Sequence, residues 1–149
     1  MEYSYYNPTA IQFGKGQIKS IVNFISKDQK VLVVYGGGSI KKNGVYAQVV
    51  TALDGYTWSE FGGVEANPSV ETLNKAVEII KGEKIDFILA VGGGSVIDGC
   101  KYLAVASLYD GDGWDFLEGK KVEKALSLGA ILTLPATGSE SNPTSVISK

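Results

Sequence analysis

The chain has 149 residues, a net charge of −2, and 44% hydrophobic and 20% charged residues. This is the size of one globular domain with a buried core, and it lacks the basic excess that favours nucleic acid or an anionic membrane surface. The single cysteine excludes an internal disulfide framework, and the absence of histidine removes the commonest general base and metal ligand. Without a membrane-length apolar run or a basic leader, we expect a cytoplasmic protein.

Strands and helices are predicted to alternate along the first half of the chain. Residues 11–13 predict a short strand, and apolar residues at helical spacing over 18–25 predict a helix. Residues 30–35 form an unbroken β-branched apolar run, which is typical of a central parallel strand covered on both faces. An amphipathic helix is expected over 45–53, and a strand over 56–61.

The second half continues this alternation. Asn67 and Pro68 predict a helix start, with asparagine as the N-cap, and Gly82 is the expected C-terminal cap of that helix. The elements predicted after it are a buried strand over 87–91, a helix with its apolar face at Ile97, Cys100, Leu103, Ala104 and Leu108, a polar loop over 110–121, and a strand over 130–134. Such alternation predicts an α/β fold with a doubly wound, mainly parallel sheet of the Rossmann-like type.

Two glycine clusters directly follow predicted strands. Residues 36–39 and 92–95 both read Gly-Gly-Gly-Ser, and a Thr-Gly-Ser turn occupies 137–139 after the last strand. Glycine turns at helix N-termini expose backbone N–H groups to anions and let phosphate approach closely. The carboxyl ends of parallel strands meet at one binding edge, so we expect phosphate or dinucleotide binding there. The alternative is that the glycines only make tight strand–helix turns, and neither cluster fits the GxGxxG or Walker A pattern.

The polar residues beside the second cluster have two interpretations. Ser95 and Asp98 have the spacing of a capping box, in which each side chain reaches a free N–H group at the helix start. In a ligand site, Asp98 would repel phosphate and would instead contact an uncharged ribose or amide. Lys101 lies one turn further on, where an i,i+3 ion pair with Asp98 is expected.

The residues around the first cluster bear on the choice between NADP and NAD. Lys41 and Lys42 follow Ser39 in the first turn of a predicted helix, where cations oppose the helix dipole unless an anion binds. A 2′-phosphate on the adenosine ribose is the expected anion, with Ser39 as a hydroxyl donor; the alternative is that both lysines point into solvent. Glu60, roughly 20 residues past the cluster, has the spacing of a carboxylate that binds a ribose 2′-hydroxyl in NAD. It fits the polar face of an edge strand equally well.

Residues for catalysis are scarce. There is no Tyr-x-x-x-Lys pair, and without histidine a Ser-His-Asp triad is impossible. Cys100 lies on an apolar helix face, which favours packing over a nucleophilic role. The residues therefore predict a domain that binds a cofactor without completing a reaction.

Several segments together resemble the iron-containing (group III) alcohol dehydrogenase family. They are residues 7–9, 13–16, 67–68, 92–98 and 134–142, and residues 35–42 are closest to the butanol dehydrogenase and aldehyde reductase branch of that family. The resemblance spans essentially the whole chain. It implies that residues 1–149 are an N-terminal dinucleotide-binding domain, a fragment of a two-domain enzyme whose helical metal domain is absent.

The resemblance also assigns cofactor-binding residues. NAD-preferring relatives carry an aspartate where this chain has Gly36, so the resemblance agrees with the lysines on NADP, and NAD is the alternative. The implied contacts are Gly37, Gly38 and Ser39 around the adenosine ribose, Asn67 on the adenosine side, Gly93, Gly94, Ser95 and Asp98 at the pyrophosphate and ribose, and Thr137 and Ser139 at the phosphates and nicotinamide.

The activity implied by the resemblance is the interconversion of primary alcohols and aldehydes. In the family a divalent iron or zinc, held by one aspartate and three histidines, polarises the substrate oxygen while hydride passes to or from the nicotinamide. Those ligands would lie beyond Lys149, so this chain alone is expected to be inactive. A homodimer is a further expectation. The competing hypotheses are a relative acting on glycerol, another polyol or dehydroquinate, and a stand-alone nucleotide- or phosphate-binding module.

Overall fold

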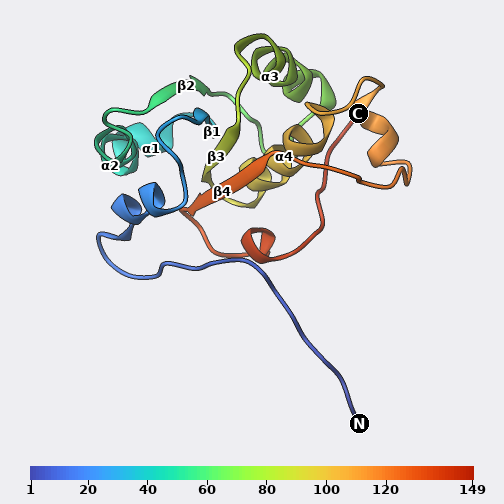
Figure 1. Ribbon diagram of the computed structural model, residues 1–149, viewed down its shortest axis with the longest axis horizontal. Helices are drawn as coiled ribbons and strands as arrows, with labels where there is room; N and C mark the ends of the chain where they lie inside the picture. Colours follow the sequence, from blue (N-terminus) through green and yellow to red (C-terminus); the bar gives the residue numbers. More distant parts are fainter.

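The computed structural model describes residues 1–149, and its centre is one four-stranded sheet with the order β2-β1-β3-β4 (Figure 1). The strands are β1 (Lys30–Tyr35), β2 (Thr57–Phe61), β3 (Phe87–Gly92) and β4 (Ser127–Leu132). All three strand pairings are parallel. Parallel neighbours require crossover connections, which the helices between the strands provide. The predicted parallel α/β sheet is therefore confirmed.

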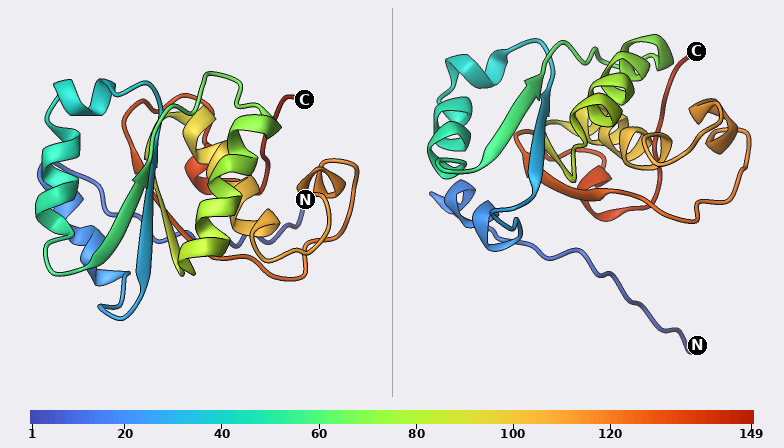
Figure 2. Two further views of the ribbon diagram at one scale, coloured as in Figure 1. Left: turned by 90° about the horizontal axis from the view of Figure 1, so that it is seen from above. Right: turned by 45° about the horizontal axis from the view of Figure 1, so that its top comes forward.

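Helices cover both faces of this sheet (Figure 2). On one face lie α3 (Val70–Glu83) and α4 (Gly94–Ala106), and on the other lie α1 (Ser39–Lys42), α2 (Val45–Ala52) and the 3₁₀ helix η1 (Gln17–Asn23). Two further 3₁₀ turns are η2 (Gly113–Phe116) and η3 (Ser139–Ser141). No helix combines the length and hydropathy needed to cross a lipid bilayer.

The core is split between the two faces by the alternation of side chains along the strands. In β3, Ile88 and Ala90 belong to the cluster that includes α3 and α4, whereas Leu89 and Val91 belong to the cluster that includes Val49 of α2. Every residue of β3 is buried. This explains the unbroken apolar run, because a central strand covered on both sides has no solvent face.

The N-terminal segment differs from the prediction. Residues 11–13 form no strand, and Phe13 is fully open to solvent at 96% exposure, because no neighbouring strand pairs with this stretch. The start of the chain extends away from the rest of the molecule (Figure 1). Asn7 then contacts η3, where its Nδ2 donates to the Ser141 carbonyl at 2.9 Å. The helix predicted over 18–25 is instead the short 3₁₀ helix η1.

The predicted caps of α3 are also wrong. Asn67 lies in the left-handed region at φ 57°, and Ser69 is the N-cap, with its Oγ accepting a hydrogen bond from the Thr72 N–H at 3.3 Å. At the other end, the helix continues past Gly82 to Glu83, and Lys84, at φ 56°, is its C-cap. Leu108, expected on the apolar face of α4, lies beyond the helix and is 38% exposed.

Candidate functional site

The two glycine turns lie side by side at the carboxyl edge of the sheet. The register of β1 and β3 places Tyr35 opposite Val91, immediately before the two turns. Val96 contacts both: its Cγ2 lies 3.7 Å from the position that a Cβ on Gly36 would take, and 2.8 Å from that on Gly92. The predicted convergence of the two clusters is confirmed. Val96, which joins them, was missed, because nothing in the sequence marks this valine among other apolar helix residues.

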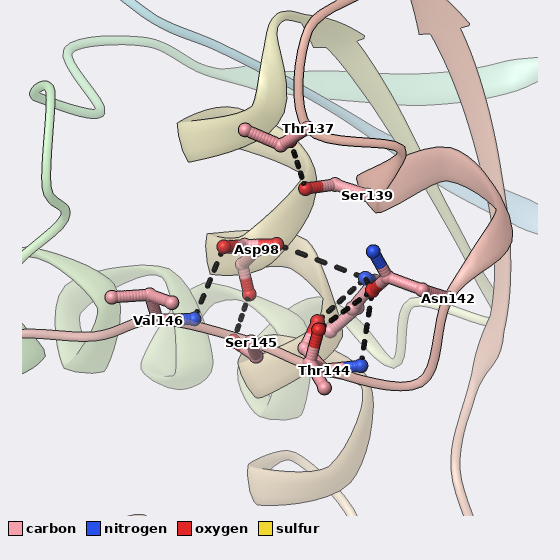
Figure 3. Close-up of polar contacts among 8 residues, drawn as sticks. Asp98, Thr137, Ser139, Asn142, Thr144, Ser145 and Val146 are labelled. Atoms are coloured by element: carbon pink, nitrogen blue, oxygen red, sulfur yellow. Dashed lines mark hydrogen bonds and ion pairs between the residues drawn. The ribbon is translucent and has the colours of Figure 1, made fainter.

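The loop after β4 closes against the second glycine turn. A Cβ on Gly94 would lie 2.7 Å from Thr137 Oγ1 and 3.3 Å from Ser139 Oγ. The two hydroxyl oxygens are themselves 2.7 Å apart and share a hydrogen bond (Figure 3). A side chain at residue 94 would therefore have to displace the Thr137 hydroxyl group. The structure therefore brings three of the predicted site residues together at the start of α4.

The N-terminus of α4 has no side-chain cap, so the predicted capping box is wrong. The N-cap residue is Gly93, which has no side chain to offer, and neither Ser95 nor Asp98 bonds a free N–H group of the helix start. Ser95 Oγ instead accepts a long hydrogen bond of 3.4 Å from the Asn67 N–H. This contact brings Asn67 to the edge of the second turn. The first N–H groups of α4 therefore have no side-chain acceptor.

Asp98 lies one turn further along α4 and faces the C-terminal segment of the chain. Its Oδ2 accepts a hydrogen bond from the Val146 N–H at 3.1 Å, and Ser145 Oγ donates to its backbone carbonyl at 2.7 Å (Figure 3). Its Oδ1 is buried and accepts no hydrogen bond. That oxygen lies 3.7 Å from Lys101 Nζ, which confirms the expected i,i+3 ion pair.

Lys101 links α4 to the loop that carries Thr137 and Ser139. Its Nζ donates to Asn142 Oδ1 at 2.9 Å and to the Thr144 carbonyl at 2.6 Å. Burial lowers the pKa of this ammonium group, chiefly through loss of solvation. The ion pair with Asp98 was predicted, but the contacts to the loop were not, because they join positions more than 40 residues apart.

The first glycine turn is open. Nothing lies within 4 Å of a Cβ built on Gly37 or Gly38, Gly38 has a φ of 93°, and Ser39 is exposed. The helix that follows, α1, has only four residues, so Lys41 and Lys42 are at its C-terminal end as much as at its start. The dipole argument for an anion beside these lysines therefore fails, because a single turn builds no appreciable dipole.

Lys41 does not simply point into solvent. Its Nζ lies 3.4 Å from Glu60 Oε1, and 5.1 Å and 4.9 Å from the ring centres of Tyr35 and Tyr46. Glu60 also accepts hydrogen bonds from the hydroxyls of both tyrosines, with the Tyr35 bond at 3.0 Å. These bonds, the one from Tyr46 above all, lower the pKa of Glu60 below its usual value, so the carboxylate is ionised at neutral pH. Sequence spacing singled out Glu60 but not its tyrosine partners.

Cys100 is fully buried on α4, and burial raises the pKa of its thiol above the ordinary range. We expect the native protein to resist a thiol reagent such as DTNB at pH 9, where a free thiol is substantially ionised. Labelling should follow unfolding when urea is added, and Cys100→Ser supplies the unlabelled baseline. Rapid modification of the folded protein would contradict the packing role.

The structure brings no three His, Cys, Asp or Glu side chains together in a group that could hold a metal ion. A divalent cation needs several such ligands at one point. The residues present therefore do not fit the iron or zinc that the resemblance implies.

An open parallel α/β sheet with glycine turns converging at its carboxyl edge defines a class of domains that bind ligands at that edge. The sequence model of the iron-containing alcohol dehydrogenases matches residues 8–149. The chain belongs to the iron-containing alcohol dehydrogenase family.

Two relatives illustrate the family relationship. The chain is 50% identical to the NADPH-dependent aldehyde reductase YqhD of Escherichia coli and 51% identical to the probable NADH-dependent butanol dehydrogenase 1 of Bacillus subtilis. These alignments cover 99% and 97% of the chain, but only 39% and 38% of the two relatives. The chain thus spans about two fifths of the length of these relatives.

Solved structures agree with the sequence comparisons. The crystal structure of Escherichia coli YqhD has a TM-score of 0.95 and 49% identity, covering 99% of this chain and 39% of that one. The structure of the NADH-dependent butanol dehydrogenase A of Thermotoga maritima has a TM-score of 0.93 and 48% identity to this chain. The match covers 98% of this chain and 38% of that one. The fold described above is therefore that of the corresponding part of these enzymes.

Proposed function

We propose that residues 1–149 form the N-terminal dinucleotide-binding domain of an NAD(P)-dependent alcohol dehydrogenase that interconverts primary alcohols and aldehydes. The observation that carries this proposal is the uncapped N-terminus of α4 beside the Gly94–Thr137 contact. Backbone N–H groups that have no side-chain acceptor, in a turn that leaves no room for a Cβ, form a site suited to pyrophosphate.

The described residues fit a dinucleotide along this edge. We place the pyrophosphate against Gly93, Gly94 and Ser95, because their backbone lies at the helix N-terminus. The hydroxyls of Thr137 and Ser139 would donate to the phosphates and the nicotinamide side. Asp98 Oδ1, which is paired with Lys101 but accepts no hydrogen bond, would accept one from a ribose hydroxyl. The open turn at Gly37, Gly38 and Ser39 would take the adenosine ribose, and Asn67 would lie on the adenosine side.

We propose NADP as the preferred cofactor, with NAD as the alternative. Lys41 supplies a cation beside the first turn, and Ser39 supplies an exposed hydroxyl donor for a 2′-phosphate. The names of the relatives support either choice, since the Escherichia coli protein is described as NADPH-dependent and the Bacillus subtilis protein as NADH-dependent.

When bound, the nicotinamide ring would supply or accept the hydride of the reaction. The chain's own residues would hold the cofactor and orient its reactive end toward Thr137 and Ser139. The family is described as iron-containing, and we propose that iron, or zinc as the alternative, acts in a helical domain outside residues 1–149. A homodimer stays a prediction.

Cofactor titration of the 149-residue chain tests both parts of the proposal. NADPH is expected to bind more tightly than NADH, and Lys41→Glu should weaken NADPH binding by roughly tenfold, since it reverses one charge beside the 2′-phosphate. Lys84→Glu is the matched control, because Lys84 lies at the amino end of β3, on the opposite edge of the sheet. Equal affinities for the two cofactors would remove the NADP preference. Binding of phosphate or ADP without either dinucleotide would favour a stand-alone nucleotide- or phosphate-binding module.

A further inference from the structure

The carboxylate of Glu60 lies beside the first glycine turn, where the adenosine ribose is expected. We propose that Glu60 is a specificity-determining residue: its negative charge holds Lys41 at this turn and limits the advantage of NADP over NAD. This inference rests on the proposed function, since it concerns which dinucleotide the same site prefers. The ion pair of Lys41 and Glu60 matters because Lys41 without Glu60 would present an uncompensated positive charge to the ligand.

The backbone fixes where Glu60 lies. In the register of β1 and β2, Glu60 is opposite Val33, at the last position but one of β2. The chain that follows is bonded to the first turn, because the Gly63 N–H donates to the Gly36 carbonyl at 2.9 Å. A Cβ on Gly62 would lie 2.5 Å from the Tyr35 ring, so this stretch runs directly over that ring. The end of β2 is therefore held against the glycine turn.

The carboxylate is held as firmly as its backbone. Oε1 accepts from the Tyr35 hydroxyl at 3.0 Å and from Lys41 Nζ at 3.4 Å, and Oε2 accepts from the Tyr46 hydroxyl. Tyr35 is 7% exposed, and its ring meets that of Tyr46 edge-on with centres 6.2 Å apart. Two packed aromatic rings thus fix both oxygens, and a carboxylate that accepts several hydrogen bonds remains charged.

The charges of Lys41 and Glu60 determine which adenosine ribose the first glycine turn favours. A 2′-phosphate beside Ser39 would meet the positive charge of Lys41 and, a few ångströms further, the negative charge of Glu60. The two charges oppose each other in their effect on an anion. The 2′-hydroxyl of NAD carries no charge and is not repelled, and a carboxylate at the end of the second strand is a suitable acceptor for it. Glu60 therefore reduces the binding of NADP more than that of NAD.

The test measures the dissociation constants of NADP⁺ and NAD⁺ for the 149-residue chain and its variants. Glu60→Gln is expected to raise the preference for NADP⁺ over NAD⁺ by roughly three- to tenfold. This is the expected effect of removing one negative charge several ångströms from a phosphate, where solvent and salt partly screen the repulsion. Glu60→Asp keeps the charge and should keep the preference within about twofold of wild type. Glu83→Gln is the matched control, because Glu83 also accepts a hydroxyl bond, from Ser59 at 2.7 Å, but lies at the end of α3.

A Lys41→Met background separates the two parts of the inference. In this background, Glu60→Gln should change the preference for NADP⁺ less than it does in the wild-type chain. The reason is that no lysine charge remains for Glu60 to compensate. An equal change would overturn the role of Glu60 in holding Lys41. If Glu60→Gln lowers the preference, or weakens both dinucleotides by the same factor, Glu60 has only a structural role and the inference is wrong, while the proposed function stands. Failure of wild type to bind either dinucleotide would instead overturn the proposed function, and the inference with it.

Discussion

Leu89→Ala is expected to lower the free energy of unfolding by about 2–5 kcal/mol. Leu89 is fully buried at the centre of β3, between Val33 of β1 and Gly129 of β4. Its removal leaves a cavity that the neighbouring strands cannot fill, because their hydrogen-bonded spacing is fixed. Urea denaturation followed by circular dichroism measures the change.

The control for this substitution is Leu108→Ala. Leu108 is 38% exposed and lies beyond the end of α4, so the same truncation is expected to cost less than about 1 kcal/mol. Similar losses at the two positions would mean that the sheet interior is not the main source of stability.

Gly94→Val is expected to weaken NADP⁺ binding by roughly 100-fold, which corresponds to the loss of about one strong charge-assisted hydrogen bond. A Cβ at this position would lie 2.7 Å from Thr137 Oγ1 and 3.3 Å from Ser139 Oγ. The valine side chain would push the loop away and also occupy the space that the phosphates need. Isothermal titration calorimetry gives the affinity, and a thermal melt shows that the sheet remains folded.

Gly82→Val is the matched control for Gly94→Val. Nothing lies within 4 Å of a Cβ built on Gly82, which is inside α3 near its C-terminal end. Cofactor affinity should therefore stay within about twofold of wild type. Wild-type affinity in Gly94→Val would contradict the placement of the phosphates.

The central strands could be predicted because their burial is visible in the sequence. Residues 30–35 match β1, and residues 87–91 fall one residue short of β3, since both strands are apolar throughout. The start of α3 could not be predicted in the same way. The sequence Asn-Pro is typical of a helix start, but the N-cap is Ser69, whose Oγ accepts a hydrogen bond from the Thr72 N–H. Asn67 lies before the helix in a left-handed backbone conformation, which asparagine tolerates.

For the candidate site, the glycine turns and their shared edge were predictable, because strand ends in a parallel sheet converge. The contacts that shape the site were not. Tyr46 reaches Glu60 from 14 residues away, and Lys101 reaches Thr144 from 43 residues away. Such pairs depend on how the elements pack together, and a single sequence carries no signal for them.

The strand order β2-β1-β3-β4 has a consequence for how the chain is assembled during synthesis. Parallel pairing joins residues far apart in sequence, which generally slows folding. Here, however, β1 and β2 are the first pair to emerge, β3 then adds to the free edge of β1, and β4 adds to the free edge of β3. No strand has to insert between two that are already paired. The sheet can therefore grow outward in the order in which a ribosome delivers it.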